Sequence, residues 1–276
     1  MHELHFTSAG RRWIADLHAP VDLAIPLEFD GPQPRFFIDQ PASARPLEAG
    51  GFTGRVRTGS SCNCAVQTLA PHCHGTHTEC VGHVTRDDTT LAEVTPVPPT
   101  LALAVSVLPV PLGSRLHDRP TVCEPQDPVI TRELLATAAQ RWARDPWTAL
   151  VVRTLPNDPS KRHRAYDGPC PAPYFTPDAM RWIVERGVDS LVVDLPSLDR
   201  ADDGGGLAAH RAYWGLRPSA QAARLAARGR ALVTELAYVP DTAADGLYLL
   251  DLQVPAFASD AAPSRPVLYP VQEATP

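Results

Sequence analysis

Residue types that bind metal ions are concentrated in one stretch of the chain, Pro71 to His83, which reads PHCHGTHTECVGH. This stretch holds four of the ten histidines of the protein, two of its six cysteines and one glutamate. Imidazole and carboxylate are common ligands of zinc, manganese and iron. A single histidine would more often be a hydrogen-bonding residue in a polar loop, but a cluster of this density favours a metal site.

The spacing within the stretch points to the same conclusion. His77, Glu79 and His83 are separated by even numbers of residues, so an extended segment would direct all three side chains to one face. Gly75 supplies a residue that tolerates a tight bend, which would bring His72 or His74 to the same ion from the preceding segment.

This stretch resembles the signature of the cyclase family of metal-dependent hydrolases, H-x-G-T-H-x-D-x-P-x-H, a family that includes kynurenine formamidase and isatin hydrolase. Gly75-Thr76-His77, the acidic Glu79 and His83 fall in step with that signature. Glu79 replaces the family aspartate and Val81 replaces the family proline.

The first histidine of the signature has no direct counterpart, because the residue four positions before His77 is Cys73. One extra residue in the turn would let His72 take that role as the first metal ligand. His74 and Cys73 are the alternatives.

Two further segments extend the resemblance. Val21 to Leu27 and Ser190 to Asp199 are similar to other blocks of the family. The resemblance also implies that a histidine and then a glutamate, further along the chain, complete the metal site. His210 and Glu235 are the natural counterparts. Glu235 lies on an otherwise apolar segment, where an isolated buried charge would be costly; the alternatives are an arginine partner or exposure to solvent. For Ser197 and Asp199, we expect loop capping and no catalytic role.

Apolar strands alternate with capped helices along the chain. Helices are predicted from Thr131, with Thr131 as N-cap, from Pro177, and over 219–228, and the predicted strands are 101–108, 149–154, 190–194, 231–239 and 246–254. A proline-rich tail is predicted after the last strand. With the resemblance, this order implies one α/β domain over 1–276, with a mixed, partly closed β-sheet flanked by helices.

The segment 30–60 is rich in proline, glycine and polar residues, which predicts a long loop. Phe36, Phe37 and Phe52 in this loop would either wall a substrate pocket or fill the core beneath it. Cys62 and Cys64 are too close together for a zinc knuckle, and we expect them to be packing residues.

Composition excludes several classes of partner. A formal charge of −6 without a basic stripe argues against nucleic acid, and no run approaches the ~20 apolar residues of a membrane helix. No signal peptide is visible, so reduced thiols in the cytoplasm are expected. The resemblance implies a homodimer or homotetramer.

The predicted activity is hydrolysis of an amide, an aryl formamide similar to N-formylkynurenine, or a lactam, all small-molecule substrates. One or two ions of zinc or manganese would lower the pKa of a water molecule and polarise the carbonyl. His72, His77 and Glu79 would hold the first ion, Glu79 and Glu235 would bridge to a second beside His210, and His83 would transfer protons. A Ser-His-Asp hydrolase lacks support, because no G-x-S-x-G is present. A catalytically silent metal-binding protein is the alternative.

Overall fold

Four parallel strands form the centre of a large mixed sheet in the computed structural model, which describes residues 2–113, 122–167 and 171–274. They are β9 (Thr100–Val107), β12 (Ala149–Thr154), β14 (Ser190–Val193) and β15 (Leu232–Glu235). Antiparallel strands flank them: β16 (Gly246–Gln253) pairs with β9, and β8 (His77–Glu79) pairs with β15. The outer strands of the same sheet are β1 (Glu3–Ser8), β2 (Arg11–Asp16), β3 (Val21–Asp22), β17 (Ala261–Pro263) and β18 (Arg265–Glu273).

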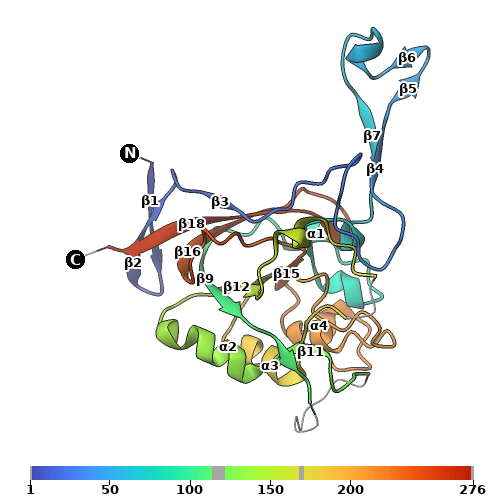
Figure 1. Cartoon of the computed structure of the whole chain (residues 1–276). Coiled ribbons are helices and arrows are strands. Elements are labelled where there is room, and N and C mark those ends of the chain that lie inside the picture. Colours follow the sequence, from blue (N-terminus) through green and yellow to red (C-terminus); the bar gives the residue numbers. More distant parts are fainter. Residues whose placement is uncertain (1, 114–121, 168–170, 275–276) are drawn as a thin grey trace.

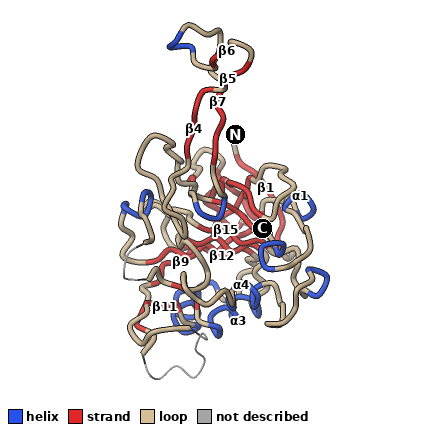
Figure 2. The backbone as a smooth tube through the Cα atoms, turned by 90° about the vertical axis from the view of Figure 1, so that its right-hand side faces the viewer, coloured by secondary structure: helices blue, strands red, loops and turns tan. Residues whose placement is uncertain are grey.

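The central strands are buried on both faces, which explains their nearly continuous apolar sequences. Along β9, Leu101, Leu103 and Val105 belong to one core cluster, whereas Ala102 and Ala104 belong to a second cluster on the opposite face. Helices α2 (Arg132–Ala139), α3 (Pro177–Glu185) and α4 (Ala208–Tyr213) cover the first of these faces (Figures 1 and 2). The prediction of an α/β protein with a mixed sheet flanked by helices is therefore confirmed.

Two of the predicted helices form, and each begins at the residue type that favours a helix start. The Thr131 side chain accepts a hydrogen bond from the backbone N–H of Leu134 at the start of α2, and α3 begins at Pro177. The shorter elements are α1 (Leu91–Val94), η1 (Val56–Thr58), η2 (Pro71–Cys73), η3 (Val81–Val84), η4 (Gln140–Trp142), η5 (Pro159–His163), η6 (Ala223–Leu225), β10 (Val110–Pro111), β11 (Pro128–Ile130) and β13 (Tyr174–Phe175).

Two predictions for the second half of the chain are wrong. The predicted helix 219–228 contains only the single turn η6, because its backbone is tied to other segments: Arg228 N–H donates to Trp214 O and Gln221 O accepts from Arg86 N–H. The expected proline-rich tail forms β17 and β18 instead, and β18 lies between β2 and β16 in the sheet. Prolines in β18 still offer carbonyl acceptors, as Pro266 O shows by accepting from Leu23 N–H.

An arm projects from the body where a long loop was predicted (Figure 1). Strands β4 (Ser43–Pro46) and β7 (Ala65–Thr68) form its antiparallel stem, and β5 (Glu48–Ala49) pairs with β6 (Phe52–Thr53) near its tip. In the arm, residues 43–68, the only buried residue is Gly54. Cys62 and Cys64 are exposed here, so the expectation that they pack in the core is wrong; Cys170 lies outside the described residues.

The loop after β14 is fixed by a buried ion pair. Lys161 Nζ lies 2.8 Å from Asp194 Oδ2, and Asp194 also accepts hydrogen bonds from the backbone N–H and the hydroxyl of Thr154. These contacts satisfy both oxygens of a fully buried carboxylate. They hold the start of the segment 194–199, which reaches the candidate site. Within the described ranges, no helix has the length and apolar character needed to cross a bilayer.

Candidate metal centre

The short strand β8 places two side chains of the candidate site on one face. Within His77–Glu79 the alternation of a strand directs His77 and Glu79 to the same side, as predicted, and both side chains are completely buried. Thr78 points to the opposite side, where its hydroxyl contacts the hydroxyls of Thr234 and Ser264.

The neighbouring strand β15 brings Glu235 to the same face. Glu235 is the register partner of His77 in the antiparallel β8–β15 pair, and its Oε2 lies 3.5 Å from His77 Nε2. Its other oxygen accepts a hydrogen bond of 2.8 Å from the backbone N–H of Leu198. The parallel strand β15 ends at Glu235, in agreement with the tendency of α/β sheets to form sites at these strand ends.

Helix α4 contributes His210, which is almost fully buried. Its Nε2 lies 3.0 Å from Glu79 Oε1 and 3.2 Å from Glu235 Oε1. Its Nδ1 lies 2.7 Å from Asp199 Oδ2, and the same carboxylate accepts the backbone N–H of Ala209. Asp199 therefore orients the His210 ring, a role beyond the loop capping expected from the sequence.

The turn before β8 brings in His72. Gly75 has φ +77°, the left-handed conformation predicted for the bend, and His72 lies on the 3₁₀ turn η2 ahead of it. His72 Nδ1 lies 3.0 Å from Glu79 Oε2. His74 is directed elsewhere, with Nε2 at 2.9 Å from Gln40 O and Nδ1 at 3.1 Å from Ala70 O.

His83 reaches the cluster by a different route from the one expected. The extended segment ends at Glu79, and residues Val81–Val84 form the 3₁₀ turn η3, so the predicted continuous strand to His83 is wrong. The turn nevertheless brings His83 Nε2 to 3.8 Å from Glu79 Oε2. The His83 ring stacks on His72, with ring centroids 4.2 Å apart.

Several buried nitrogen and oxygen atoms at the centre of this cluster have no hydrogen-bond partner. Among the described residues, they include His77 Nε2, His210 Nε2 and both carboxylate oxygens of Glu79. Since buried polar atoms are nearly always hydrogen-bonded, a group of such atoms facing one another requires an explanation. A divalent cation would satisfy all of them.

The outer nitrogens of the same two histidines support that explanation. His77 Nδ1 lies 3.1 Å from Gly75 O and His210 Nδ1 lies 2.7 Å from Asp199. An Nδ1–H that donates to such an acceptor leaves the Nε2 lone pair directed toward the two glutamates, which is the usual arrangement of a metal-binding histidine. The residues present therefore fit a metal ion with oxygen and nitrogen ligands, such as zinc or manganese.

Charge is concentrated strongly in this small volume. Burial alone would raise the pKa of Glu79, but His83 and His210 hold that pKa well below its usual range. Burial alone would lower the pKa of His210, but Glu79, Asp199 and Glu235 raise it well above its usual value. The site therefore favours ionised carboxylates and attracts positive charge, whether from protons or from a metal ion.

The potential ligand atoms fall into three groups. In each group, the atoms lie within 4.8 Å of one another, and the groups are His72, His77 and Glu79; Glu79, His83 and His210; and His72, His83 and Asp260. Glu235 contacts members of the first two. In the part of the chain that the structure describes, Cys73 belongs to none of these groups.

A cavity of about 480 Å³ opens onto the cluster. Its floor includes His72, His83, His210 and Glu235, whereas His77 and Glu79 do not line it. Apolar walls come from Phe36, Phe37, Pro196 and Leu207, with Arg200 and Ser197 among the polar lining. Phe36 and Phe37 thus wall a pocket, whereas Phe52 lies on the arm in β6.

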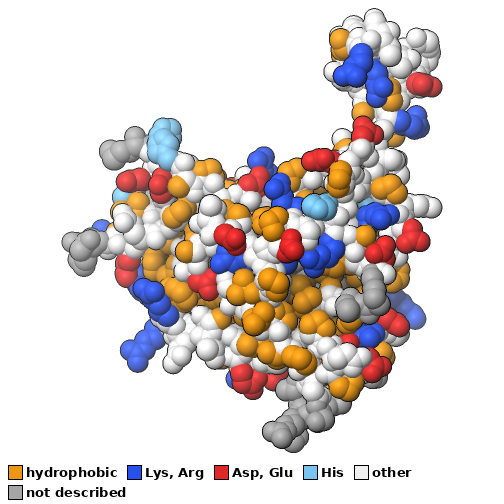
Figure 3. Space-filling view, in the orientation of Figure 1, with side chains coloured by type: hydrophobic (Ala, Val, Ile, Leu, Met, Phe, Trp, Pro, Cys, Tyr) orange, Lys and Arg blue, Asp and Glu red, His pale blue; other side chains and the backbone are white. Residues whose placement is uncertain are grey.

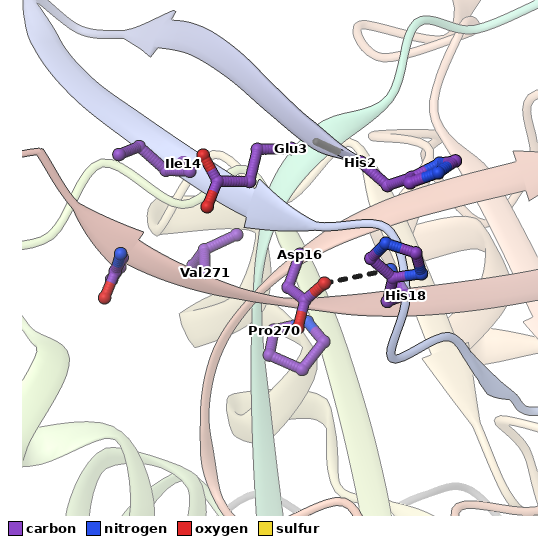
Figure 4. Close-up of a pocket in the computed structure, with 8 residues that line it drawn as sticks. His2, Glu3, Ile14, Asp16, His18, Pro270 and Val271 are labelled. Atoms are coloured by element: carbon purple, nitrogen blue, oxygen red, sulfur yellow. Dashed lines mark hydrogen bonds between the residues drawn. The ribbon is translucent and has the colours of Figure 1, made fainter.

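Another hollow, of about 450 Å³, lies at the far edge of the sheet between β1, β2 and β18 (Figure 4). Its lining includes His2, Glu3, Asp16 and His18, but Asp16 is engaged in a local turn, accepting the backbone N–H of His18 at 2.9 Å. None of the three potential ligand groups found in the described ranges lies here, so this hollow is not the candidate centre.

Asp260 was not identified from the sequence. Its Oδ2 lies 2.9 Å from His72 Nε2 and 3.6 Å from His83 Nδ1. One signal was present: Asp260 is the only carboxylate residue between Asp251 and Glu273, in a segment of small and apolar residues. Like Glu235, Asp260 is an isolated charge among largely apolar residues and therefore needs a partner.

Comparison with protein families gives one match. A family model described as "Putative cyclase" matches residues 21–200. A search of curated proteins finds no match to this chain.

Solved structures with the same fold include three whose names describe a function. Isatin hydrolase A from Labrenzia aggregata, bound to benzyl benzoate, aligns with a TM-score of 0.58 and 17% identity over 91% of this chain and 93% of that chain. Isatin hydrolase A from Ralstonia solanacearum aligns with a TM-score of 0.56 and 18% identity over 92% of each chain. A predicted metal-dependent hydrolase from Bacillus stearothermophilus aligns with a TM-score of 0.55 and 14% identity over 91% and 98%. At these identities, the likeness establishes the fold alone.

Proposed function

Because this chain belongs to the cyclase family, we propose that it is a metal-dependent hydrolase that cleaves an amide, an aryl formamide or a lactam. The observation that carries the proposal is the set of buried nitrogen and oxygen atoms without a hydrogen-bond partner around Glu79, next to a cavity of substrate size that is lined by His210 and Glu235. A silent scaffold would retain the ligands but has no need of a pocket that opens onto them.

We propose two ion positions in this cluster. His72, His77 and Glu79, whose ligand atoms lie within 4.8 Å of one another, would hold one ion. His210 and Glu235, whose Nε2 and Oε1 lie 3.2 Å apart, would hold a second together with Glu79. Zinc or manganese suits this mixture of imidazole and carboxylate. When bound, such an ion supplies a water molecule of lowered pKa and polarises a carbonyl.

The protein's own groups supply proton transfer and apolar surface. His83 lies in the cavity beside Glu79 and can take a proton from the attacking water and return it to the departing nitrogen. Phe36 and Leu207, beside the largely exposed Phe37, present apolar surface to an aromatic ring.

The substrate class follows from the cavity and from the names of structural relatives. The cavity fits a small aromatic molecule. Two relatives are named isatin hydrolases, which supports testing a lactam beside N-formylkynurenine. We propose that this activity takes place in the cytoplasm, where the exposed thiols of Cys62 and Cys64 would stay reduced.

Hydrolysis by the purified protein is the direct test of function. Protein produced without a histidine tag, in medium supplemented with zinc or manganese, is expected to hydrolyse at least one of N-formylkynurenine, isatin and formanilide, and to stop after chelation. Ultraviolet absorbance follows each reaction, and elemental analysis of the same sample gives the metal content. A preparation that holds one to two ions per chain but converts none of the three would support the silent scaffold.

The identity of the first ligand is tested by a pair of histidine variants. We expect His72→Ala to weaken metal binding by more than the ~10–100-fold that loss of an outer partner costs, because His72 Nδ1 faces Glu79. His74→Ala is the matched control and should keep its metal, since the His74 ring contacts Gln40 O and Ala70 O. Chelator competition measures both affinities, and the reverse pattern would make His74 the ligand.

The arm supports a proposal about assembly. An isolated two-stranded hairpin is marginally stable in water, and the arm (residues 43–68) buries no apolar side chain against the body. It carries three arginines and one glutamate in a chain of net charge −6, and its basic side chains project beyond the body (Figure 3). We propose that the arm docks on the more acidic body of a second copy, giving a homodimer or homotetramer.

Truncation of the arm tests this assembly. Ser43 pairs with Thr68 and Ala44 with Gln67, so deleting 45–66 and joining Ala44 to Gln67 through Asn-Gly closes the stem with a tight turn. Light scattering is expected to give an oligomer for the full chain and a monomer for the truncated one. A monomeric full chain, or equal masses for the two, would contradict the proposal.

A further inference from the structure

Asp260 holds a position that the proposed function does not use. It lies immediately before β17, whose residue Ala261 pairs with Glu79 in the antiparallel β8–β17 ladder. Its backbone is fixed as well, since Asp260 O accepts the N–H of Cys80 at 2.9 Å. A carboxylate from the C-terminal part of the chain is thus held against the turn that carries His83.

Gly82, in the turn that carries His83, lies close to Asp260. A Cβ atom at Gly82 would lie 2.0 Å from Thr89 O and 3.2 Å from Asp260 Cβ, so a side chain here would clash with the Thr89 carbonyl and crowd Asp260. The backbone of Asp260 is therefore held by its bond to Cys80 and packs tightly against Gly82.

The two carboxylate oxygens of Asp260 have different partners. Oδ1 accepts a hydrogen bond of 3.3 Å from the Ser259 hydroxyl. Oδ2 lies 2.9 Å from His72 Nε2 and 3.6 Å from His83 Nδ1, so it contacts one nitrogen of each of the two stacked rings. One oxygen atom therefore faces both the first proposed ligand and the proposed proton carrier.

The contact also decides which His72 nitrogen faces the ion position. His77 and His210 have Nδ1 tied to an acceptor and Nε2 directed inward, whereas His72 has Nε2 tied to Asp260 and Nδ1 directed toward Glu79. His72 is thus reversed relative to the other two. Without Asp260, His72 Nε2 would lose its hydrogen-bond partner, and the contact between Nδ1 and Glu79 alone would hold the ring.

We infer that Asp260 is a positioning residue that fixes His72 for metal binding through Nδ1 and, through the same oxygen, aligns His83 beside it. The inference rests on the proposed function for the role of His83, but its effect on His72 concerns metal binding alone. Asp260 lines no part of the cavity, so it acts through the two histidines and does not touch substrate.

The nitrogen that binds the metal can be observed directly. In zinc-loaded full-length protein, long-range proton–nitrogen NMR spectra distinguish a protonated Nε2 from a protonated Nδ1. We expect His72 to carry its proton on Nε2, opposite to His77 and His210. The same tautomer at all three histidines would overturn the inference.

Variants of Asp260 give the second measurement. Asp260→Ala and Asp260→Asn are expected to bind zinc ~10–100-fold more weakly in chelator competition, as for other outer partners of ligating histidines. They should also lower kcat at saturating zinc and shift its pH profile, a change that a loss of folded protein would not produce. Asp251→Asn on β16, whose carboxylate accepts a hydrogen bond from the Gln253 side chain, is the matched control and should change none of these values.

The outcomes separate the inference from the proposed function. Weaker zinc binding in Asp260→Ala, in a protein without hydrolase activity, would support the role of Asp260 and remove the proposed function. Wild-type zinc affinity and kcat in a hydrolytically active Asp260→Ala would overturn the inference and leave the function in place. Thermal unfolding of the zinc-free variants shows whether any loss arises from misfolding.

Discussion

Replacing Glu79 by glutamine is expected to abolish both metal binding and hydrolysis. Glu79 Oε1 faces His210 at 3.0 Å, and Oε2 faces His72 at 3.0 Å, so one carboxylate serves both proposed ion positions. Glutamine keeps the size of the side chain but removes its negative charge. Since a bound ion contributes several kcal/mol of transition-state stabilisation, we expect kcat/KM to fall by at least ~10³-fold.

Metal affinity is the more direct measurement for this variant. Zinc should raise the unfolding temperature of the wild-type protein, because a ligand that binds only the folded state stabilises it, and should leave that of Glu79→Gln unchanged. Glu48→Gln on the exposed arm is the control for the loss of one carboxylate. A Glu79→Gln protein with full metal content would show that the ions are held elsewhere.

The aspartate variant tests the departure from the family signature. Glu79→Asp restores the residue type of the signature but withdraws the carboxylate by one methylene from His72 and His210. We expect metal to be retained at lower affinity, because the surrounding residues are placed for the longer side chain. This result would show that the positions of His72 and His210 are adapted to the length of the glutamate side chain.

The parts of the site that could be predicted from sequence depend on local geometry. His77 and Glu79 share a face because successive side chains of a strand point to opposite faces. The chain bends at Gly75 because glycine readily adopts a positive φ. Glu235 was identified from an isolated charge on an apolar strand, and the register places it opposite His77. The alternation, the bend and the isolated charge are each set by residues close in the sequence, whereas the register opposite His77 joins two distant segments.

The predictions that were wrong concern segments whose structure depends on contacts with distant parts of the chain. The short alternation of polar and apolar residues after Glu79 fits both a strand and the turn η3, so the sequence alone could not show that the backbone turns before His83. The prolines of β18 suggested an irregular tail, although the β16–β18 ladder accommodates them. Because this region was predicted to be a tail, Asp260 was not identified as a partner of the histidines. The Ala-rich segment 219–228 has high helix propensity, but bonds to Trp214 and Arg86 override it.

His83 separates catalysis from metal binding, and its replacement is expected to have the second large effect. His83→Gln should retain its metal, because His72, His77, Glu79, His210 and Glu235 remain in place. It should lose ~10²–10⁴-fold in kcat, the usual contribution of a general acid–base group. The side chain is one quarter exposed in the cavity wall, so it can exchange protons with substrate and solvent.

Three measurements together define this role. Elemental analysis should give the same metal content for His83→Gln and for the control His163→Gln, an exposed histidine on η5. The control should keep wild-type kcat, and added imidazole should restore part of the activity of His83→Gly by replacing the missing base. Loss of metal together with activity would instead make His83 a ligand of the ion that faces Glu79 and His210. Full activity in metal-loaded His83→Gln would leave proton transfer to another group, and the stacking of His83 on His72 would then be its only function in the site.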